Sequence, residues 1–115
     1  MYIRNRFKED PRVIVVKGCS FEILESYPDE YFDYVYLDGG HDYNTVHKDI
    51  QVLEKKVKNH GIIAFNDFTY FTMSDNYEYG VYRAVRELLG RTKHQVIGYC
   101  LSLRKLDDII IRLEK

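Results

Sequence analysis

Short apolar runs alternate with segments of helical periodicity along this chain of 115 residues. Such alternation is typical of βαβ units, in which a helix crosses over between two parallel strands. The first three runs are continuously apolar, as in parallel strands that are covered on both faces. The sequence therefore predicts an α/β fold with a mixed sheet of about five strands. The runs expected to form the strands are 13–16, 34–37, 62–65, 95–101 and 109–113.

The segments between these runs have the spacing of helices. Ser20 is expected to cap the amino terminus of a short helix. Residues 46–57 repeat apolar side chains every three or four positions, and Gly61 is expected to end this helix in the left-handed conformation. A third helix is expected over 81–89, with Gly90 as its end.

The crossover rule decides how these elements are arranged. Connections between parallel strands are almost always right-handed, so we expect the helices mainly on one face of the sheet. The last two runs are joined by too few residues for a crossover, so the last strand should be antiparallel. The expected strand order is 1-2-3-5-4, with the first run placed beside the second.

This arrangement leaves the other sheet face bare. Only Tyr2, Ile3 and Phe7 are available to cover it. We therefore expect a homodimer through the uncovered face or edge, with strand exchange between two chains if the first run does not pair beside the second.

Composition narrows the function classes. The formal net charge is -1, which argues against a nucleic-acid or anionic-membrane partner. No apolar run approaches the roughly 18 residues of a membrane span, and Met1–Asp10 lacks the apolar core of a signal peptide. Cys19 and Cys100 form no ligand pair, which fits a reducing compartment. We expect a single cytoplasmic domain over 1–115.

Polar residues follow the first three runs. They are Gly18–Ser20, Asp38–Asp42 and Asn66–Asp67. Open α/β sheets bind ligands at the carboxyl ends of their parallel strands, so these clusters should meet at one edge. Asp38, Asn66 and Asp67 would offer the hard oxygen ligands that suit Mg²⁺.

Each cluster has a plainer interpretation as well. Asp38 and the Asn66–Asp67 pair could simply shape turns, and His41 could cap the next helix or lie in solvent. Cys19 is interpreted as a small packed residue rather than a nucleophile. The common position of the clusters at one sheet edge favours a site.

Other polar and aromatic residues are assigned more simply. The tyrosine-rich segment Thr69–Gly80 is either a lid over the strand ends or a loop packed by its own aromatics, and the lid is favoured. The remaining histidines and an acidic pair are taken as surface residues: His47, His60, His94, Asp107 and Asp108.

Three segments resemble a known family in the same order along the chain. Phe32–Tyr43 (FDYVYLDGGHDY), His60–Phe68 (HGIIAFNDF) and Gly80–Leu88 (GVYRAVREL) are similar to the later motifs of class I S-adenosylmethionine-dependent methyltransferases. Methyltransferase family 24 is the subgroup they most resemble. The resemblance implies the carboxyl-terminal portion of a Rossmann-like methyltransferase domain.

The family pattern also implies roles for individual residues. Asp38, Asn66 and Asp67 match the positions that hold a divalent cation, such as Mg²⁺, in metal-dependent relatives, where the cation lowers the pKa of a substrate hydroxyl. His41 stands where relatives place a general base. The reaction would be O-methyl transfer to a small-molecule acceptor. The positions matching the cofactor site are Gly18, Cys19, Ser20, Asp38 and Gly39.

The departures from the family pattern concern the cofactor, S-adenosylmethionine. The glycine-rich loop and the acid that holds the ribose are absent from this sequence, and Cys19 replaces the usual aspartate. We therefore do not expect tight cofactor binding by this polypeptide alone. Two alternatives remain: an inactive, self-associating remnant of the fold, and a metal-dependent hydrolase using Asp38, His41 and Asp67.

Overall fold

A computed structural model describes residues 9–40, 42–66, 68, 71–72, 77–78, 80–100 and 108–115. The main sheet has four strands in the order β1-β2-β6-β5, and β1 and β2 are parallel. β6 runs antiparallel to both of its neighbours, as expected from the short connection before it. The strands are β1 (Phe32–Leu37), β2 (Val57–Phe65), β5 (Gln95–Cys100) and β6 (Asp108–Arg112).

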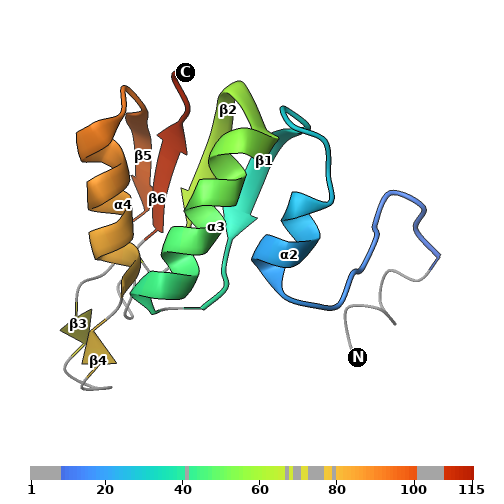
Figure 1. The fold of residues 1–115 in the computed structure, drawn as a ribbon, viewed down its shortest axis with the longest axis horizontal. Coiled ribbons are helices and arrows are strands. Elements are labelled where there is room, and N and C mark those ends of the chain that lie inside the picture. The colour runs from blue at the N-terminus through green and yellow to red at the C-terminus, as the bar shows by residue number, and fades with distance from the viewer. Residues whose placement is uncertain are drawn as a thin grey trace.

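Three helices pack against the same face of this sheet, which confirms the expectation from the crossover rule (Figure 1). They are α2 (Ser20–Glu25), α3 (Tyr43–Lys56) and α4 (Gly80–Arg91). A separate antiparallel pair, β3 (Phe71–Thr72) and β4 (Tyr77–Glu78), lies between β2 and α4 in the chain. The rest of the tyrosine-rich segment, and with it the proposed lid, lies outside the described residues.

The expected first strand is wrong. Residues 13–16 form no strand, and the side chain of Ile14 is 80% exposed. In the described part of the chain β1 pairs with β2 alone, so it lies at the edge of the sheet and the main sheet has four strands instead of five. An apolar run marks a candidate strand but does not ensure pairing, and here the free edge of β1 stays unpaired among the described residues. The other four strands follow the expected relative order.

The core lies between the sheet and α3 and α4. Val46, Ile50 and Leu53 on α3 are buried, as their spacing predicted. They meet residues from β2 and β6 that point to the same face, such as Ile63 and Ile111, which are paired across the two strands. Alternate residues of a strand point to opposite faces, so the neighbouring positions face away from the helices.

The face without helices is formed by these neighbouring positions. On β1 it carries Tyr34 and Tyr36, which are 55% and 48% exposed. Ile62 is paired with Tyr34 and Ile110 lies two strands away, and both are half-buried. The structure thus leaves an apolar, tyrosine-bearing surface uncovered by the described residues. The residues expected to cover part of it, Tyr2, Ile3 and Phe7, lie outside the described residues.

Several expected boundaries shift by a few residues. β2 begins at Val57, directly after α3, and Gly61 lies within this strand instead of ending the helix. Near this boundary it is His60, not Gly61, that has positive φ, at 67°. Gly61 is needed for space, since a Cβ there would lie 2.6 Å from Cγ1 of Val57 and 2.8 Å from the carbonyl oxygen of Lys58. Gly90 lies inside α4, which continues to Arg91.

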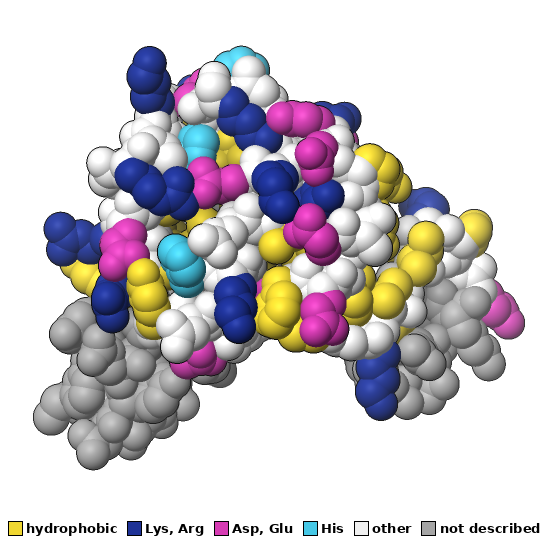
Figure 2. Space-filling model, viewed as in Figure 1, with side chains coloured by type: hydrophobic (Ala, Val, Ile, Leu, Met, Phe, Trp, Pro, Cys, Tyr) yellow, Lys and Arg dark blue, Asp and Glu magenta, His cyan; other side chains and the backbone are white. Residues whose placement is uncertain are grey.

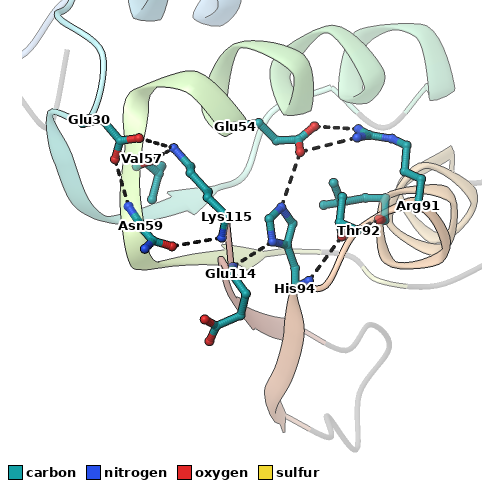
Figure 3. A network of polar contacts seen from close by, with 10 residues as sticks. Glu30, Glu54, Val57, Asn59, Arg91, Thr92, His94, Glu114 and Lys115 are labelled. Atoms are coloured by element: carbon teal, nitrogen blue, oxygen red, sulfur yellow. Dashed lines mark hydrogen bonds and ion pairs between the residues drawn. The ribbon is translucent and has the colours of Figure 1, made fainter.

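A network of polar side chains lies at the end of the sheet where β1 and β2 begin (Figure 3). His94 was expected at the surface, but its side chain is only 5% exposed. Its Nδ1 accepts the backbone N–H of Glu114 at 2.9 Å, so in the neutral ring Nε2 carries the proton, 3.4 Å from Glu54. Glu54 in turn pairs with Arg91 at 2.6 Å.

The last residue belongs to the same network. The Lys115 ammonium donates to Glu30 at 2.8 Å, and its backbone N–H donates to the Asn59 side chain at 2.9 Å. Glu30 also accepts the backbone N–H of Asn59. The network therefore joins the end of β6 to the starts of β1 and β2.

Basic and acidic side chains are interleaved on the helix-covered side of the molecule (Figure 2). Hydrophobic side chains gather on this side over α2 and the segment before it, where Ile14 and Val16 are exposed. Among the described residues no helix has the length and apolarity that crossing a membrane requires.

Candidate functional site

The carboxyl ends of β1 and β2 bring two of the expected site residues together. The Asn66 amide donates to Oδ1 of Asp38 at 2.7 Å, and the backbone N–H of Asn66 donates to the carbonyl of Leu37 at 3.0 Å. This contact follows from the register, which pairs the last residue of β1, Leu37, with the last residue of β2, Phe65. The expectation that Asp38 and Asn66 meet at one rim of the sheet agrees with this geometry.

A small cavity opens at this rim. Its volume is about 10 Å³, which is room for about one water molecule and far too little for a nucleoside. The described residues at this rim therefore do not enclose a ligand of that size. The cavity is lined by Leu37, Asp38, Gly39, Gly40, Val46, Phe65, Asn66 and Val81.

The loop after β1 ends in a helix cap. Asp42 is the N-cap of α3, and its carboxylate accepts the backbone N–H of Thr45 at 3.0 Å and the hydroxyl of Thr45 at 2.9 Å. These hydrogen bonds hold the pKa of Asp42 below its usual range. The cap is thus Asp42, not its neighbour His41, for which capping had been one interpretation. His41 and Asp67 lie outside the described residues, so their predicted roles remain predictions.

Beside the rim, polar contacts join the first turn of α3 to Arg83 and Glu87 of α4. The Tyr43 hydroxyl donates to Glu87, and this hydrogen bond raises the pKa of Tyr43 and lowers that of Glu87. The guanidinium of Arg83 lies 4.0 Å from the centre of the Tyr43 ring. Arg83 also pairs with Glu87 at 3.3 Å.

The turn Gly18–Ser20 is linked to the rim by the buried carboxyl group of Asp49. Ser20 is the first residue of α2 and does not cap it, because its hydroxyl donates to Oδ1 of Asp49 at 2.7 Å. Cys19 takes the cap position without a side-chain hydrogen bond, and it is exposed, not packed as expected. Asp49 is completely buried on α3.

The side chains at the rim suit a divalent cation only in part. Asp38 and Asn66 lie within 2.7 Å of each other and are hard ligands, so their chemistry suits Mg²⁺. Asn66 turns its amide nitrogen to Asp38, and its oxygen lies 3.3 Å from the Tyr36 hydroxyl, so it would have to turn over to coordinate an ion. Among the described residues no group of three His, Cys, Asp or Glu side chains is placed to hold a metal ion.

Sequence reasoning did not single out Asp49 or the Tyr43–Glu87 pair. An acidic residue among the apolar positions of α3, directly before Ile50, was the available signal for Asp49. The Tyr43–Glu87 contact joins residues 44 positions apart, and no spacing pattern indicates such a pair.

Comparison with known proteins places this geometry in context. A family model described as a methyltransferase domain matches residues 2–68, which is more than half of the chain. A search of curated proteins finds no match.

Solved structures share the fold at low sequence identity. A protein from Sulfolobus solfataricus described as a type 11 methyltransferase matches 98% of this chain and 65% of its own, with TM-score 0.66 and 10% identity. A protein from Thermus thermophilus described as a DNA modification methylase matches 84% of this chain and 52% of its own, with TM-score 0.58 and 6% identity. This chain thus spans between about half and two thirds of those proteins.

Proposed function

Because the chain belongs to a family of methyltransferase domains, we propose that it is part of an S-adenosylmethionine-dependent O-methyltransferase. The observation that carries the proposal is the family match over residues 2–68, which includes the loop Asp38–Gly40 and ends just beyond Asn66. Ligands bind at this edge of open α/β sheets, at the carboxyl ends of parallel strands.

The rim residues have distinct parts in this proposal. S-adenosylmethionine, when bound, would supply an electrophilic methyl group on a sulfonium. Gly39 and Asp38 lie in the loop at the carboxyl end of β1, where the nucleoside would bind in this proposal. Asp38 and the turn Gly18–Ser20 would hold the cofactor, and His41 would take the proton from the acceptor hydroxyl. Orientation of that oxygen behind the methyl group would give most of the rate.

Metal assistance is the finer part of the proposal. Asp38, Asn66 and Asp67 would hold a divalent cation that lowers the pKa of the acceptor hydroxyl. Calorimetric titration with MgCl₂ and MnCl₂ tests this part: binding should be lost in Asp38→Ala and retained in Asp33→Ala, which removes an exposed carboxylate elsewhere on β1. Equal binding by both variants would contradict the metal assignment.

The acceptor is proposed to be a small molecule in the cytoplasm. The net charge of -1 offers no basic field for a nucleic acid, and both cysteines are free thiols, as a reducing compartment favours.

A titration with S-adenosylhomocysteine, followed by the backbone amide resonances, tests the cofactor assignment. We expect saturable shifts confined to Gly18–Ser20 and Asp38–Gly40, with a Kd near 1 mM, about -4 kcal/mol, because we expect this polypeptide to hold only part of the cofactor site. Asp38→Ala should weaken these shifts, and Asp33→Ala should not. Absence of any shift at the rim would contradict the cofactor assignment, and micromolar binding would contradict the incompleteness of the site.

A second candidate function is a self-associating remnant of the fold. The uncovered tyrosines Tyr34 and Tyr36 and the exposed segment 13–16 favour it, because apolar surfaces of this kind usually meet another protein. A stable homodimer together with no response to S-adenosylhomocysteine would support this candidate over the enzyme.

A further inference from the structure

The Asp49 carboxyl is the buried polar group of the described chain whose hydrogen bonding is incomplete. Its Oδ1 accepts the Ser20 hydroxyl at 2.7 Å, but Oδ2 has no hydrogen-bond partner among the described residues. The residue is 0% exposed, so water does not compensate for the missing partner. A buried acceptor without a donor costs about 1–3 kcal/mol, which is a large penalty for a small domain.

The free oxygen points to the loop after β1. A Cβ built on Gly39 would lie 3.7 Å from Oδ2, so the open side of Gly39 faces this oxygen. One carboxyl group on α3 is therefore bonded to the turn that starts α2 and lies near the loop that follows β1. These are the two chain segments that flank the proposed cofactor position.

We propose that Asp49 is a positioning residue that couples the two segments, with Oδ1 bound to Ser20 and Oδ2 accepting the backbone N–H of Gly39 when the Asp38–Gly40 loop closes. The closed loop and the Gly18–Ser20 turn then move as one unit. The identity of the ligand between them rests on the proposed function, whereas the coupling itself does not.

Burial raises the pKa of Asp49, while the hydrogen bond from Ser20 lowers it. A donor from Gly39 would favour the ionised form in the same way. Closure of the Asp38–Gly40 loop would therefore give the Gly39 N–H an acceptor and give Oδ2 of Asp49 the donor that it lacks.

The test needs no ligand and uses the full chain. The Gly39 amide resonance is compared in wild type, Ser20→Ala, Asp49→Asn and the double variant, with hydrogen exchange of the same amide as a second readout. Ser26→Ala is the matched control, because Ser26 lies at the other end of α2 and donates to the carbonyl of Ile23.

Coupling predicts that Ser20→Ala displaces the Gly39 resonance more than Ser26→Ala does, and that this displacement disappears in the Asp49→Asn background. Exchange of the Gly39 amide should be faster in Asp49→Asn than in wild type. A Gly39 amide that does not respond to Ser20→Ala would overturn the proposal, even if Asp49→Asn proved too unstable to study. A failed S-adenosylhomocysteine titration would instead count against the cofactor assignment and leave this result standing.

Discussion

At Gly80 the backbone of α3 leaves no space for a side chain. A Cβ on this residue would lie 2.1 Å from the backbone nitrogen of Tyr43 and 2.3 Å from its Cα. Because both atoms belong to backbone, no rotamer change relieves the contact. The close approach brings the first turn of α4 to the first turn of α3, beside the rim.

We predict that Gly80→Ala lowers the free energy of unfolding by about 3 kcal/mol, at the upper end of the cost of overpacking. Gly90→Ala is the control on the same helix, since nothing lies within 4 Å of its Cβ position. It should raise stability by about 0.5–1 kcal/mol because alanine favours helix. Urea denaturation measures both, and equal effects of the two substitutions would contradict the packing argument.

Asp49 makes a second prediction at the residue scale, for pH dependence. Burial raises its pKa in the folded chain, so between the ordinary pKa of about 3.9 and the folded value the unfolded chain binds fewer protons. The contribution of this group to stability therefore falls as pH rises through that interval and stays low above it. Asp49→Asn should remove this dependence.

The measurement is the difference in unfolding free energy between wild type and Asp49→Asn from pH 3.5 to 7. The variant should gain stability relative to wild type as pH rises. Asp42→Asn is the contrasting control, because the pKa of Asp42 is lowered and its contribution is lost as pH falls. A constant difference for Asp49→Asn would show that its carboxyl is not shifted upward.

At the scale of elements, the periodicity of apolar residues predicted those helices and strands that are held by burial and by local hydrogen bonds. The apolar repeat of α3 and the relative order of four strands followed from spacing and connection length. The strand at 13–16 did not form, because an apolar run does not determine whether it pairs with an available edge, here that of β1. Asp38 and Asn66 were predictable as neighbours from adjacent strand ends, whereas the Ser20–Asp49 bond depends on how α2 packs on α3.

The unpaired segment 13–16 gives the prediction at this scale. Ile14→Ser should change the unfolding free energy by less than about 0.5 kcal/mol, since the side chain is 80% exposed. If two chains associate by exchanging this segment, the same substitution should raise the dimer Kd about tenfold, or about 1.4 kcal/mol. Sedimentation equilibrium measures the Kd.

Tyr34→Lys serves as the comparison for association, because it places a charge on the uncovered sheet face. If Tyr34→Lys weakens association and Ile14→Ser leaves it unchanged, the interface lies on the uncovered sheet face. That outcome would contradict strand exchange.

At the scale of the whole molecule, the two ends of the sheet differ. One end carries the loops of the candidate site, and the other is joined by the network of His94, Glu54 and Lys115. We predict that His94→Ala costs about 2 kcal/mol, because it leaves a cavity and removes the acceptor for the Glu114 N–H.

His60→Ala is the matched control, since this histidine contacts the side chain of the same Glu114 at 3.0 Å but is 67% exposed. Its loss should cost less than about 1 kcal/mol, as for other exposed side-chain contacts. Chemical denaturation of both variants checks the pair, and similar costs would mean that the buried network does not stabilise this end of the sheet.

The absence of tryptophan among eleven tyrosines has a practical consequence for the open sheet face. Replacing Tyr34 by tryptophan would place the only indole of the molecule where the side chain is 55% exposed. Its emission wavelength would then report, without any added dye, whether water or another protein surface lies against the sheet. The Tyr34→Trp variant would thus carry an optical probe of self-association on the uncovered sheet face.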